Sequence, residues 1–366
     1  MTVQKVGIVG AGTMGSGIAT NIAQHGFAVR LVDTGQEMVD AALVKARDFY
    51  VKQTERGRMT AADAAAAGDA LTGGTDLAPL ADCDLVIEAV FERIDIKADL
   101  YGKLNGILPA ETILATNTSC LRVGALAASV DRPERFLGMH YFNPPAINPI
   151  VEVVRGEKTA PATVEAALAF CAATGKQAVS CRDSSGFALN RFFCPYVNEA
   201  VRLFDDGLGT PYEIDRVACD VFGAAAGPFV VINLVGSQVL LHSQDNLRPL
   251  GEFYTPAASV ERVGQEQGLW DISDPSPPDE ARDTAIAERL MGATFLPVLQ
   301  ELDEEVAVPD DIDLGAKLAL KFGKPPCAVM DALGGDEVAR LIDAPCRRYG
   351  VAPPKSLDRV GRLAAR

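Results

Sequence analysis

The stretch VGIVGAGTMGSGIATNIAQHG, residues 6–26, decides the fold of this 366-residue chain. Its apolar start, residues 6–9, predicts a buried strand, and the pattern after the glycines predicts a helix. Between the two, Gly10 permits a tight turn, Gly12 lets the backbone approach a pyrophosphate, and Gly15 lets the helix pack against the strand. Because the helix then points its N-terminal amides at the phosphates, the segment predicts the first turn of a doubly wound, Rossmann-type α/β domain that binds a dinucleotide. The cofactor-binding residues that it supplies are Gly10, Gly12, Thr13, Met14 and Gly15.

The next segment, FAVRLVD at residues 27–33, supports the same interpretation. It is typical of a second strand, and it ends at Asp33. A carboxylate at this point binds both hydroxyls of an adenosine ribose and repels a 2′-phosphate. No arginine follows in residues 34–37, so NAD is favoured over NADP. The alternative is a glycine-rich turn without nucleotide, but it accounts for neither the flanking strand and helix nor the acid.

A helical insertion is predicted after this strand. One helix covers residues 37–57, and a second follows Thr60, whose hydroxyl is a suitable N-cap. This insertion is the candidate lid of the domain. Its basic cluster of Lys52, Arg56 and Arg58 either meets ligand phosphates or is a solvated helix end.

Polar residues gather at the ends of two further strands. Residues 84–90, DLVIEAV, predict a continuous apolar strand that is followed by a helix over about residues 94–105. Residues 112–121, TILATNTSCL, repeat this plan. Ligands of open α/β sheets bind at the carboxyl ends of the strands, so polar residues there are candidates for the site. They are Glu88, Glu92, Asn117, Thr118 and Ser119.

The segment GMHYFNPPAINPIVEVV, residues 138–154, contains the residues with the clearest chemistry. His140 ends an apolar run and precedes a loop with three prolines, which restrict the backbone and should hold the imidazole still. Glu152 is the single polar residue of the apolar strand that follows, and a buried carboxylate needs a partner. A histidine paired with a carboxylate is a usual form of general base. A core histidine beside an unrelated glutamate is the alternative that these residues leave open.

Composition narrows the class of protein. The net charge is −15, which argues against a nucleic-acid partner because phosphate contacts need clustered Lys and Arg. No apolar run is long enough to span a bilayer, and the short, glycine-rich N-terminal segment predicts a strand rather than a signal peptide. The eight cysteines show no metal-binding spacing and there are only three histidines, so we expect no metal site and no membrane association. Reduced cysteines in a cytoplasmic protein are the expected state.

The second half of the chain is helical in its periodicity. An apolar stripe recurs at helical spacing from Phe193 to Phe204, and Asn190 extends it by one turn. A lone amide on a buried helix face is either a satisfied structural group or a ligand contact. The residues alone favour the structural alternative.

This helical half is repeated at an offset of 98 residues. The segment at residues 190–236 aligns with residues 288–334 without a gap, and Arg191, Asp205 and Asp215 match Arg289, Asp303 and Asp313. An internal repeat indicates two domains of one kind. We therefore predict three domains: an NAD-binding domain at residues 1–182, a first helical domain at 183–270, and a second at 283–350, joined through the proline-rich acidic linker at 271–280. The second copy has Glu288 where the first has Asn190, and no dinucleotide domain of its own, so we interpret it as structural.

Taken together, these segments resemble the L-3-hydroxyacyl-CoA dehydrogenase family. The resemblance covers about residues 3–240, in the family's order and spacing, through GAGTMGSGIA, LVD, EAVFE, TNTSCL, GMHYFNPP, IVEVV and SGFALNRFF. The tandem helical pair resembles the C-terminal half of the large multifunctional fatty-oxidation proteins. The family implies an α/β Rossmann N-terminal domain followed by all-α C-terminal domains. It also implies NAD-dependent oxidation of a 3-hydroxyacyl thioester to the 3-ketoacyl thioester, or the reverse.

The resemblance also assigns roles to residues. It implies that His140 is the catalytic base and Glu152 its partner, that the hydroxyl of Ser119 meets the substrate's 3-oxygen, and that Asn190 offers an amide at the thioester. The family positions that touch or border the dinucleotide are occupied here by Asp33, Glu92, Lys97, Asn117 and Asn143.

Two departures from the family and two rival functions stand beside this interpretation. Asn233 replaces the family's usual aspartate and Ser185 its usual proline, which leaves the shape of the substrate pocket open. One rival is a biosynthetic dehydrogenase acting on thioesters of acyl carrier protein. The other is an inactive nucleotide-binding regulator, against which the intact set of catalytic residues argues.

The repeat also bears on the oligomeric state. The apolar face of so small a helical domain needs a matching surface, so we expect the second copy to pack against the first and to replace a partner subunit. A monomer with an internal pseudo-dimer is then expected. A homodimer with four helical domains is the alternative.

Overall fold

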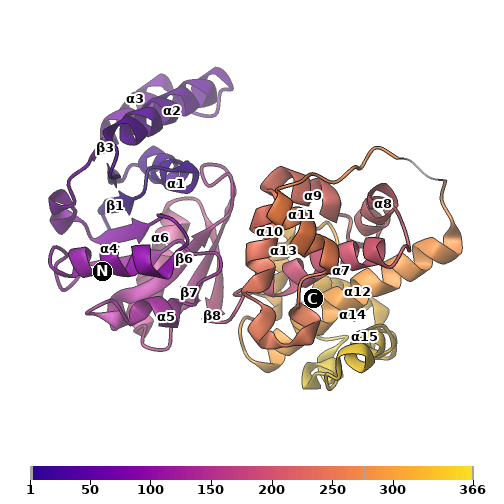
Figure 1. Ribbon diagram of the computed structural model, residues 1–366. Helices are drawn as coiled ribbons and strands as arrows, with labels where there is room; N and C mark the ends of the chain where they lie inside the picture. The colour runs from indigo at the N-terminus through magenta and orange to yellow at the C-terminus, as the bar shows by residue number, and fades with distance from the viewer. Residues whose placement is uncertain (1–2, 275–276, 365–366) are drawn as a thin grey trace. The chain divides into compact units, whose positions relative to one another are not determined.

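The computed structural model describes residues 3–274 and 277–364. The chain forms two compact units, Met1–Asp183 and Ser184–Arg366 (Figure 1). We call them the sheet unit and the helical unit and describe each by itself.

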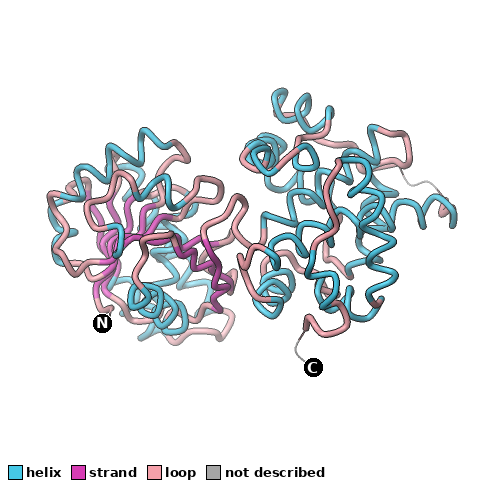
Figure 2. Tube along the Cα trace, turned by 90° about the horizontal axis from the view of Figure 1, so that it is seen from below, coloured by secondary structure: helices cyan, strands magenta, loops and turns pink. Residues whose placement is uncertain are grey.

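The sheet unit is built on one sheet, which has eight strands among the residues that the structure describes. Their order is β3-β2-β1-β4-β5-β6-β7-β8, and neighbouring strands are parallel except for the antiparallel pair β6 and β7. Helices lie on both sides of the strands (Figure 2). The chain changes direction across the sheet between β1 and β4, which is typical of a dinucleotide-binding domain, so the predicted fold class is confirmed. The strands are β1 (Lys5–Val9), β2 (Ala28–Val32), β3 (Leu71–Gly74), β4 (Leu85–Glu88), β5 (Ile113–Thr116), β6 (Phe136–Tyr141), β7 (Ile150–Arg155) and β8 (Gln177–Arg182).

The helices of the sheet unit agree well with the predicted ones. The predicted helix at residues 94–105 is present with those bounds. The hydroxyl of Thr60 accepts a hydrogen bond from the Asp63 amide at 3.1 Å, so the predicted cap is confirmed. These helices are α1 (Thr13–Gln24), α2 (Gln36–Glu55), α3 (Ala61–Ala70), α4 (Ile94–Asn105), α5 (Val123–Ala127) and α6 (Pro161–Ala173), with short 3-10 turns at Ala78–Asp82 and Pro133–Arg135.

Strand β3 is an element that the sequence did not indicate. Its residues, LTGG, have little intrinsic preference for a strand because glycine is depleted there. A Cβ at Gly73 would lie 2.4 Å from the Cγ1 of Val39 on α2. The glycine therefore allows the helix to pack closely on the edge of the sheet, and packing decides the conformation.

The helical unit contains two successive groups of helices. The first group is α7 (Asn190–Asp205), α8 (Pro211–Phe222), α9 (Pro228–Val235), α10 (Ser237–Asp245) and α11 (Ala258–Glu266), with 3-10 turns at Arg248–Leu250 and Glu252–Tyr254. The second group is α12 (Glu280–Asp303), α13 (Pro309–Leu318), α14 (Pro326–Leu333) and α15 (Gly335–Tyr349), with a 3-10 turn at Lys355–Arg359. The predicted linker at 271–280 includes residues 275 and 276, which lie outside the described residues.

The two groups repeat the same construction at the predicted offset of 98 residues. Helices α8, α9 and α10 begin 98 residues before α13, α14 and α15, respectively. In the first group both oxygens of Asp215 accept amides at the start of α9, from Phe229 at 2.7 Å and Val230 at 2.9 Å. In the second group Asp313 caps α14 in the same way, at 2.8 and 2.9 Å. Matching residues therefore perform matching structural tasks.

The contacts between the two groups are themselves symmetric. Arg191 donates to Glu304 at 2.6 Å, and its counterpart Arg289 donates to Asp206, the counterpart of Glu304, also at 2.6 Å. A reciprocal backbone pair joins the ends of α8 and α13: residue 225 donates to the carbonyl of 321 at 3.3 Å, and residue 323 to that of 223 at 3.1 Å. Such reciprocity is the property of a two-fold interface between identical subunits. Here both halves belong to one chain.

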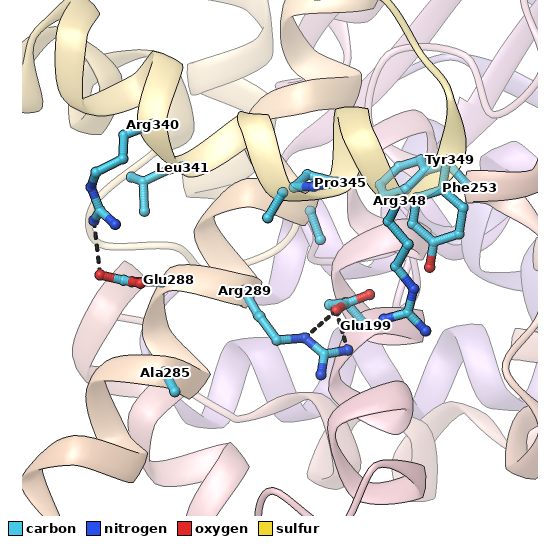
Figure 3. A pocket seen from close by; sticks show the side chains of 12 residues that line it. Glu199, Phe253, Ala285, Glu288, Arg289, Arg340, Leu341, Pro345, Arg348 and Tyr349 are labelled. Carbon is cyan, nitrogen blue, oxygen red and sulfur yellow. Dashed lines mark hydrogen bonds and ion pairs between the residues drawn. The ribbon is translucent and has the colours of Figure 1, made fainter.

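A cavity of about 350 Å³ lies in the seam between the two groups, next to α12 and α15 (Figure 3). Two arginines of its lining are paired with glutamates of the lining: Arg289 Nε donates to Glu199 at 2.7 Å and Arg340 donates to Glu288 at 2.8 Å. Glu288 stands at the position that matches Asn190 in the first group. Its ion pair with Arg340 supports the interpretation of the second copy as structural.

Candidate active site

The antiparallel pairing of β6 and β7 sets His140 directly opposite Glu152. Their side chains meet, with His140 Nδ1 at 2.7 Å from Glu152 Oε2. The imidazole is only 4% exposed and the carboxylate is fully buried, so the predicted contact between the two residues is confirmed. When Nδ1 carries a proton that the carboxylate accepts, Nε2 holds the basic lone pair. The ring of Phe142 lies against the imidazole, with 4.5 Å between ring centroids.

A second group of residues shapes the loop that contains Ser119. Glu92 Oε1 accepts hydrogen bonds from the Thr118 hydroxyl at 2.5 Å and from the amides of Ser119 at 2.8 Å and Cys120 at 3.0 Å. Burial would raise the pKa of Glu92, but the Lys97 ammonium and these three hydrogen bonds together lower the pKa below its usual value. Glu92 therefore stays ionised and holds the backbone of the Ser119 loop.

Lys97 lies beneath this loop. Its ammonium is 1% exposed and bridges two carboxylates, Glu88 at 2.6 Å and Glu92 at 3.2 Å. Glu88 also accepts the hydroxyls of Tyr101 at 2.6 Å and Thr116 at 2.8 Å. The resemblance placed Lys97 at the border of the dinucleotide, and the structure places it in the interior, where it supports the residues above it. Tyr101 and Thr116 were missed from the sequence; the signal that could have found this cluster is Glu88, an acid inside an apolar strand.

The glycine loop has the geometry that a dinucleotide requires. Gly10 has φ of 108°, and a Cβ at Gly15 would lie 1.8 Å from the Gly10 carbonyl oxygen, so both positions need glycine. Apart from its neighbours in the chain, nothing lies within 4 Å of where a Cβ of Gly12 would be, which leaves room for phosphate at the start of α1. Thr13 is exposed there and Met14 half-buried. These residues fit NAD.

Asp33 follows β2 at the same edge of the sheet. One of its oxygens accepts the Ala11 amide of the glycine loop at 2.7 Å. The other accepts weaker bonds from Thr34 and Gly35 at 3.3 Å. The carboxylate is half-buried and therefore stands beside the loop that would hold the pyrophosphate, at the place where a ribose is bound.

The two asparagines expected near the cofactor differ in their surroundings. Asn117 is buried, and its side-chain oxygen accepts the Tyr141 amide at 2.8 Å. It thereby fixes the end of β6 one residue beyond His140. Asn143 is exposed on the loop after β6, and its peptide bond to Pro144 is cis. Ser119, Asn117 and His140 thus all lie at the carboxyl ends of β5 and β6.

Asn190 belongs to the helical unit, where it is half-buried and begins α7. The two departures from the family also lie in this unit. Asn233 donates to the Trp270 carbonyl at 2.9 Å and accepts the Trp270 amide at 2.8 Å, a pair of bonds that an aspartate could not make. Ser185 is buried just before α7.

The basic cluster of the insertion is exposed at the end of α2 and beyond it. Arg58 and His25 line an open cavity of about 520 Å³ in the sheet unit. Across the described ranges 3–274 and 277–364, no group of three or more metal-binding side chains occurs and no helix is long and apolar enough to cross a membrane.

Comparison with known proteins identifies relatives of both units. Residues 5–184 match the family description "3-hydroxyacyl-CoA dehydrogenase, NAD binding domain", and residues 186–268 match "3-hydroxyacyl-CoA dehydrogenase, C-terminal domain". A 3-hydroxyadipyl-CoA dehydrogenase of Escherichia coli K12 is 38% identical over 239 residues, covering 65% of this chain and 50% of the relative, so the chain spans half of that protein's length. A probable 3-hydroxybutyryl-CoA dehydrogenase of Deinococcus radiodurans is 38% identical over 263 residues, covering 71% of this chain and 94% of the relative. The crystal structure of a 3-hydroxybutyryl-CoA dehydrogenase from E. coli K12 superposes with a TM-score of 0.89 at 25% identity and covers 99% of both chains.

Proposed function

The chain belongs to the 3-hydroxyacyl-CoA dehydrogenase family, and we propose that it oxidises a 3-hydroxyacyl-CoA to the 3-ketoacyl-CoA with NAD, or runs the reverse reaction. The observation that carries this proposal is the buried pair of His140 and Glu152 at the edge of the sheet where the glycine loop and Asp33 also lie. The names of the relatives favour CoA over a carrier protein as the thioester.

In the proposed mechanism His140 is the general base. Its Nε2 takes the proton of the substrate's 3-hydroxyl, and Glu152, which accepts the Nδ1 proton, stabilises the imidazolium that forms. Bound NAD supplies the hydride acceptor for the hydrogen on C3. In the reverse direction the imidazolium returns the proton to the 3-oxygen.

Ser119 and Asn190 would position the substrate. The hydroxyl of Ser119 would donate to the 3-oxygen, and this role is supported by the three hydrogen bonds through which Glu92 holds the Ser119 loop. The Asn190 amide would meet the thioester, as the family resemblance implies. Fixed donors help because they need no reorganisation when charge develops on the substrate.

Asp33 would select NAD. Its carboxylate stands beside the glycine loop, where it would bind the adenosine ribose hydroxyls and repel the 2′-phosphate of NADP. Glu92, Lys97, Asn117 and Asn143 complete the cofactor region in this proposal. Of these, Lys97 would act through the loop above it, since it is 1% exposed.

The relatives differ in the acyl group for which they are named. Relatives are named for the 3-hydroxybutyryl and the 3-hydroxyadipyl thioesters, which differ in length and in charge at the far end. The test is turnover of purified protein with a panel of 3-hydroxyacyl-CoA and carrier-protein thioesters, followed as NADH absorbance. Absence of NADH formation with every thioester, together with binding of NAD, would favour an inactive regulator instead.

We also infer that the second helical copy replaces the partner subunit that a single-copy relative would recruit. The inference is supported by the reciprocal ion pairs of Arg191 with Glu304 and Arg289 with Asp206, which form within one chain. A tethered partner is present at a millimolar effective concentration, so the internal contact should exclude dimerisation through the same surface. We also propose a cytoplasmic location, since the eight cysteines show no metal-binding spacing and several of them lie in apolar stretches, as reduced cysteines do.

A further inference from the structure

Lys176 lies just before β8 in the sheet unit, and its side chain is buried. The residue is 6% exposed, and its ammonium donates to two backbone carbonyls, Pro145 at 2.7 Å and Asn148 at 2.7 Å. No ion pair joins Lys176 to a carboxylate within the described part of the chain. A lysine held by carbonyl dipoles alone is unusual, because burying a charge is unfavourable unless it is paired.

This unfavourable burial of the ammonium shifts the pKa of the side chain. Burial lowers the pKa of Lys176 from its ordinary value to about 8. A methionine of similar length would fill the same space without that penalty. Packing alone therefore does not account for a lysine at this position. The two carbonyls that accept its hydrogen bonds indicate its role.

Both acceptors belong to the loop at residues 142–149, which connects the strand of His140 to the strand of Glu152. Within this loop the amides of Ile147 and Asn148 donate to the Pro144 carbonyl at 3.1 and 2.8 Å. The Asn148 side chain donates to the Asn143 carbonyl at 3.4 Å and accepts the Ile150 amide at 3.2 Å. These bonds close the loop on itself, and Lys176 ties the closed loop to the body of the sheet unit.

The same loop also touches the cofactor helix. A Cβ at Gly17 on α1 would lie 2.6 Å from the Pro145 Cγ, so Pro145 rests directly on α1, one turn after the glycine loop. The loop is therefore confined between α1 on one side and the Lys176 ammonium on the other. Movement of the loop would displace Asn143 and Phe142, which packs on the imidazole, relative to the glycine loop.

We propose that Lys176 is a positioning residue for the dehydrogenase reaction: it clamps the loop at 142–149 so that His140 and Asn143 keep their register with the cofactor held by α1. This inference rests on the proposed function. Lys176 acts through the loop and is not itself a catalytic residue. A lysine that served stability alone would leave the kinetic constants unchanged when removed.

The test compares Lys176→Met, which keeps the length of the side chain and removes its donors, with Lys158→Met, which changes an exposed lysine in the turn after β7. We expect Lys176→Met to lower kcat by about tenfold or more at a temperature where it is fully folded, with a smaller change in KM for the thioester. Lys158→Met should behave as wild type. Lys176→Ala should regain part of its kcat when ethylammonium is added, because the amine can occupy the vacated site. Should Lys176→Met not fold, Lys176→Leu, which also removes the donors, takes its place in the comparison.

A second measurement does not depend on activity. Amide hydrogen exchange of the peptide covering residues 142–149 should be faster in Lys176→Met than in wild type, while peptides from α4 remain unchanged. Wild-type kcat in Lys176→Met, or unchanged exchange in the loop, would overturn the clamp. If wild-type protein itself turns over no thioester, the proposed function fails, and the exchange measurement still decides whether Lys176 holds the loop.

Discussion

Replacing Glu152 by glutamine tests the proposed mechanism most directly, because it removes one charge and almost no volume. In the native pair the carboxylate oxygen lies 2.7 Å from His140 Nδ1, and both side chains are buried. The centres of the two charges, once the imidazolium forms, are about 4 Å apart, and at an effective dielectric constant of about 20 their attraction is about 4 kcal/mol. Since about 1.4 kcal/mol corresponds to a factor of ten in rate, we expect Glu152→Gln to lower kcat by about 10³.

The assay is steady-state NADH formation from a 3-hydroxyacyl-CoA, combined with a titration of NAD binding. The dissociation constant for NAD should change little, because the pair acts on the substrate. Glu157→Gln is the matched control, since Glu157 is exposed beyond the end of β7 and its change removes the same charge. His140→Gln should show a loss of about 10² to 10⁴.

A folded Glu152→Gln variant that retains kcat within a factor of about three of wild type would contradict this role of Glu152. That result would mean that the carboxylate neither orients the base nor stabilises its charged form. Near wild-type turnover in His140→Gln would show that the base has been assigned to the wrong residue.

Three further predictions concern the cofactor, the repeat and the buried lysine. Asp33→Asn keeps an oxygen for the Ala11 amide but loses the charge, so its preference for NAD over NADP in kcat/KM should fall by about ten- to a hundredfold; equal use of both cofactors by the unmutated enzyme would contradict the assignment. Light scattering should give a mass near 38.7 kDa, because the internal contact replaces a partner. A dimer that resists dilution would refute this replacement, and an active, soluble truncation ending near Leu269 would show that the second copy is dispensable. Burial lowers the pKa of Lys176 to about 8, with a small opposing influence from the Cys171 thiol, so the unfolded chain binds more protons than the folded one above about pH 8. The free energy of unfolding of wild type should therefore increase relative to Lys176→Met between about pH 8 and about pH 10, by at most ~3 kcal/mol in urea titrations; an unchanged difference would argue that the ammonium is not buried in solution.

Local chemistry explains what the sequence alone determined. The glycine loop could be predicted because its demands are local: Gly10 adopts φ of 108°, and a Cβ at Gly15 would meet the carbonyl oxygen of Gly10 in the same loop. Thr60 and the bounds of α4 follow from capping and periodicity, which also act over one or two turns. The second helical copy could be predicted because aligning the chain with itself shows the repeat. The matching caps made by Asp215 and Asp313 show that the similarity extends to single hydrogen bonds.

Pairings between residues distant in the chain were decided only by the tertiary structure. A loop of eight residues between β6 and β7 does not specify register, and a slip of one residue would have turned Glu152 away from His140; the antiparallel ladder places them opposite each other. The residues around Lys97 in the sequence do not indicate that its ammonium lies between Glu88 and Glu92. The residues around Lys176 likewise do not indicate which loop carbonyls it binds. Strand β3 contains Gly73, which lets α2 pack closely on the edge of the sheet. This packing between distant segments, rather than the intrinsic preference of LTGG, decides the conformation of the strand. The partners of a buried charge and the register of two strands depend on contacts between segments that are distant in the chain. Those contacts exist only once the sheet has formed.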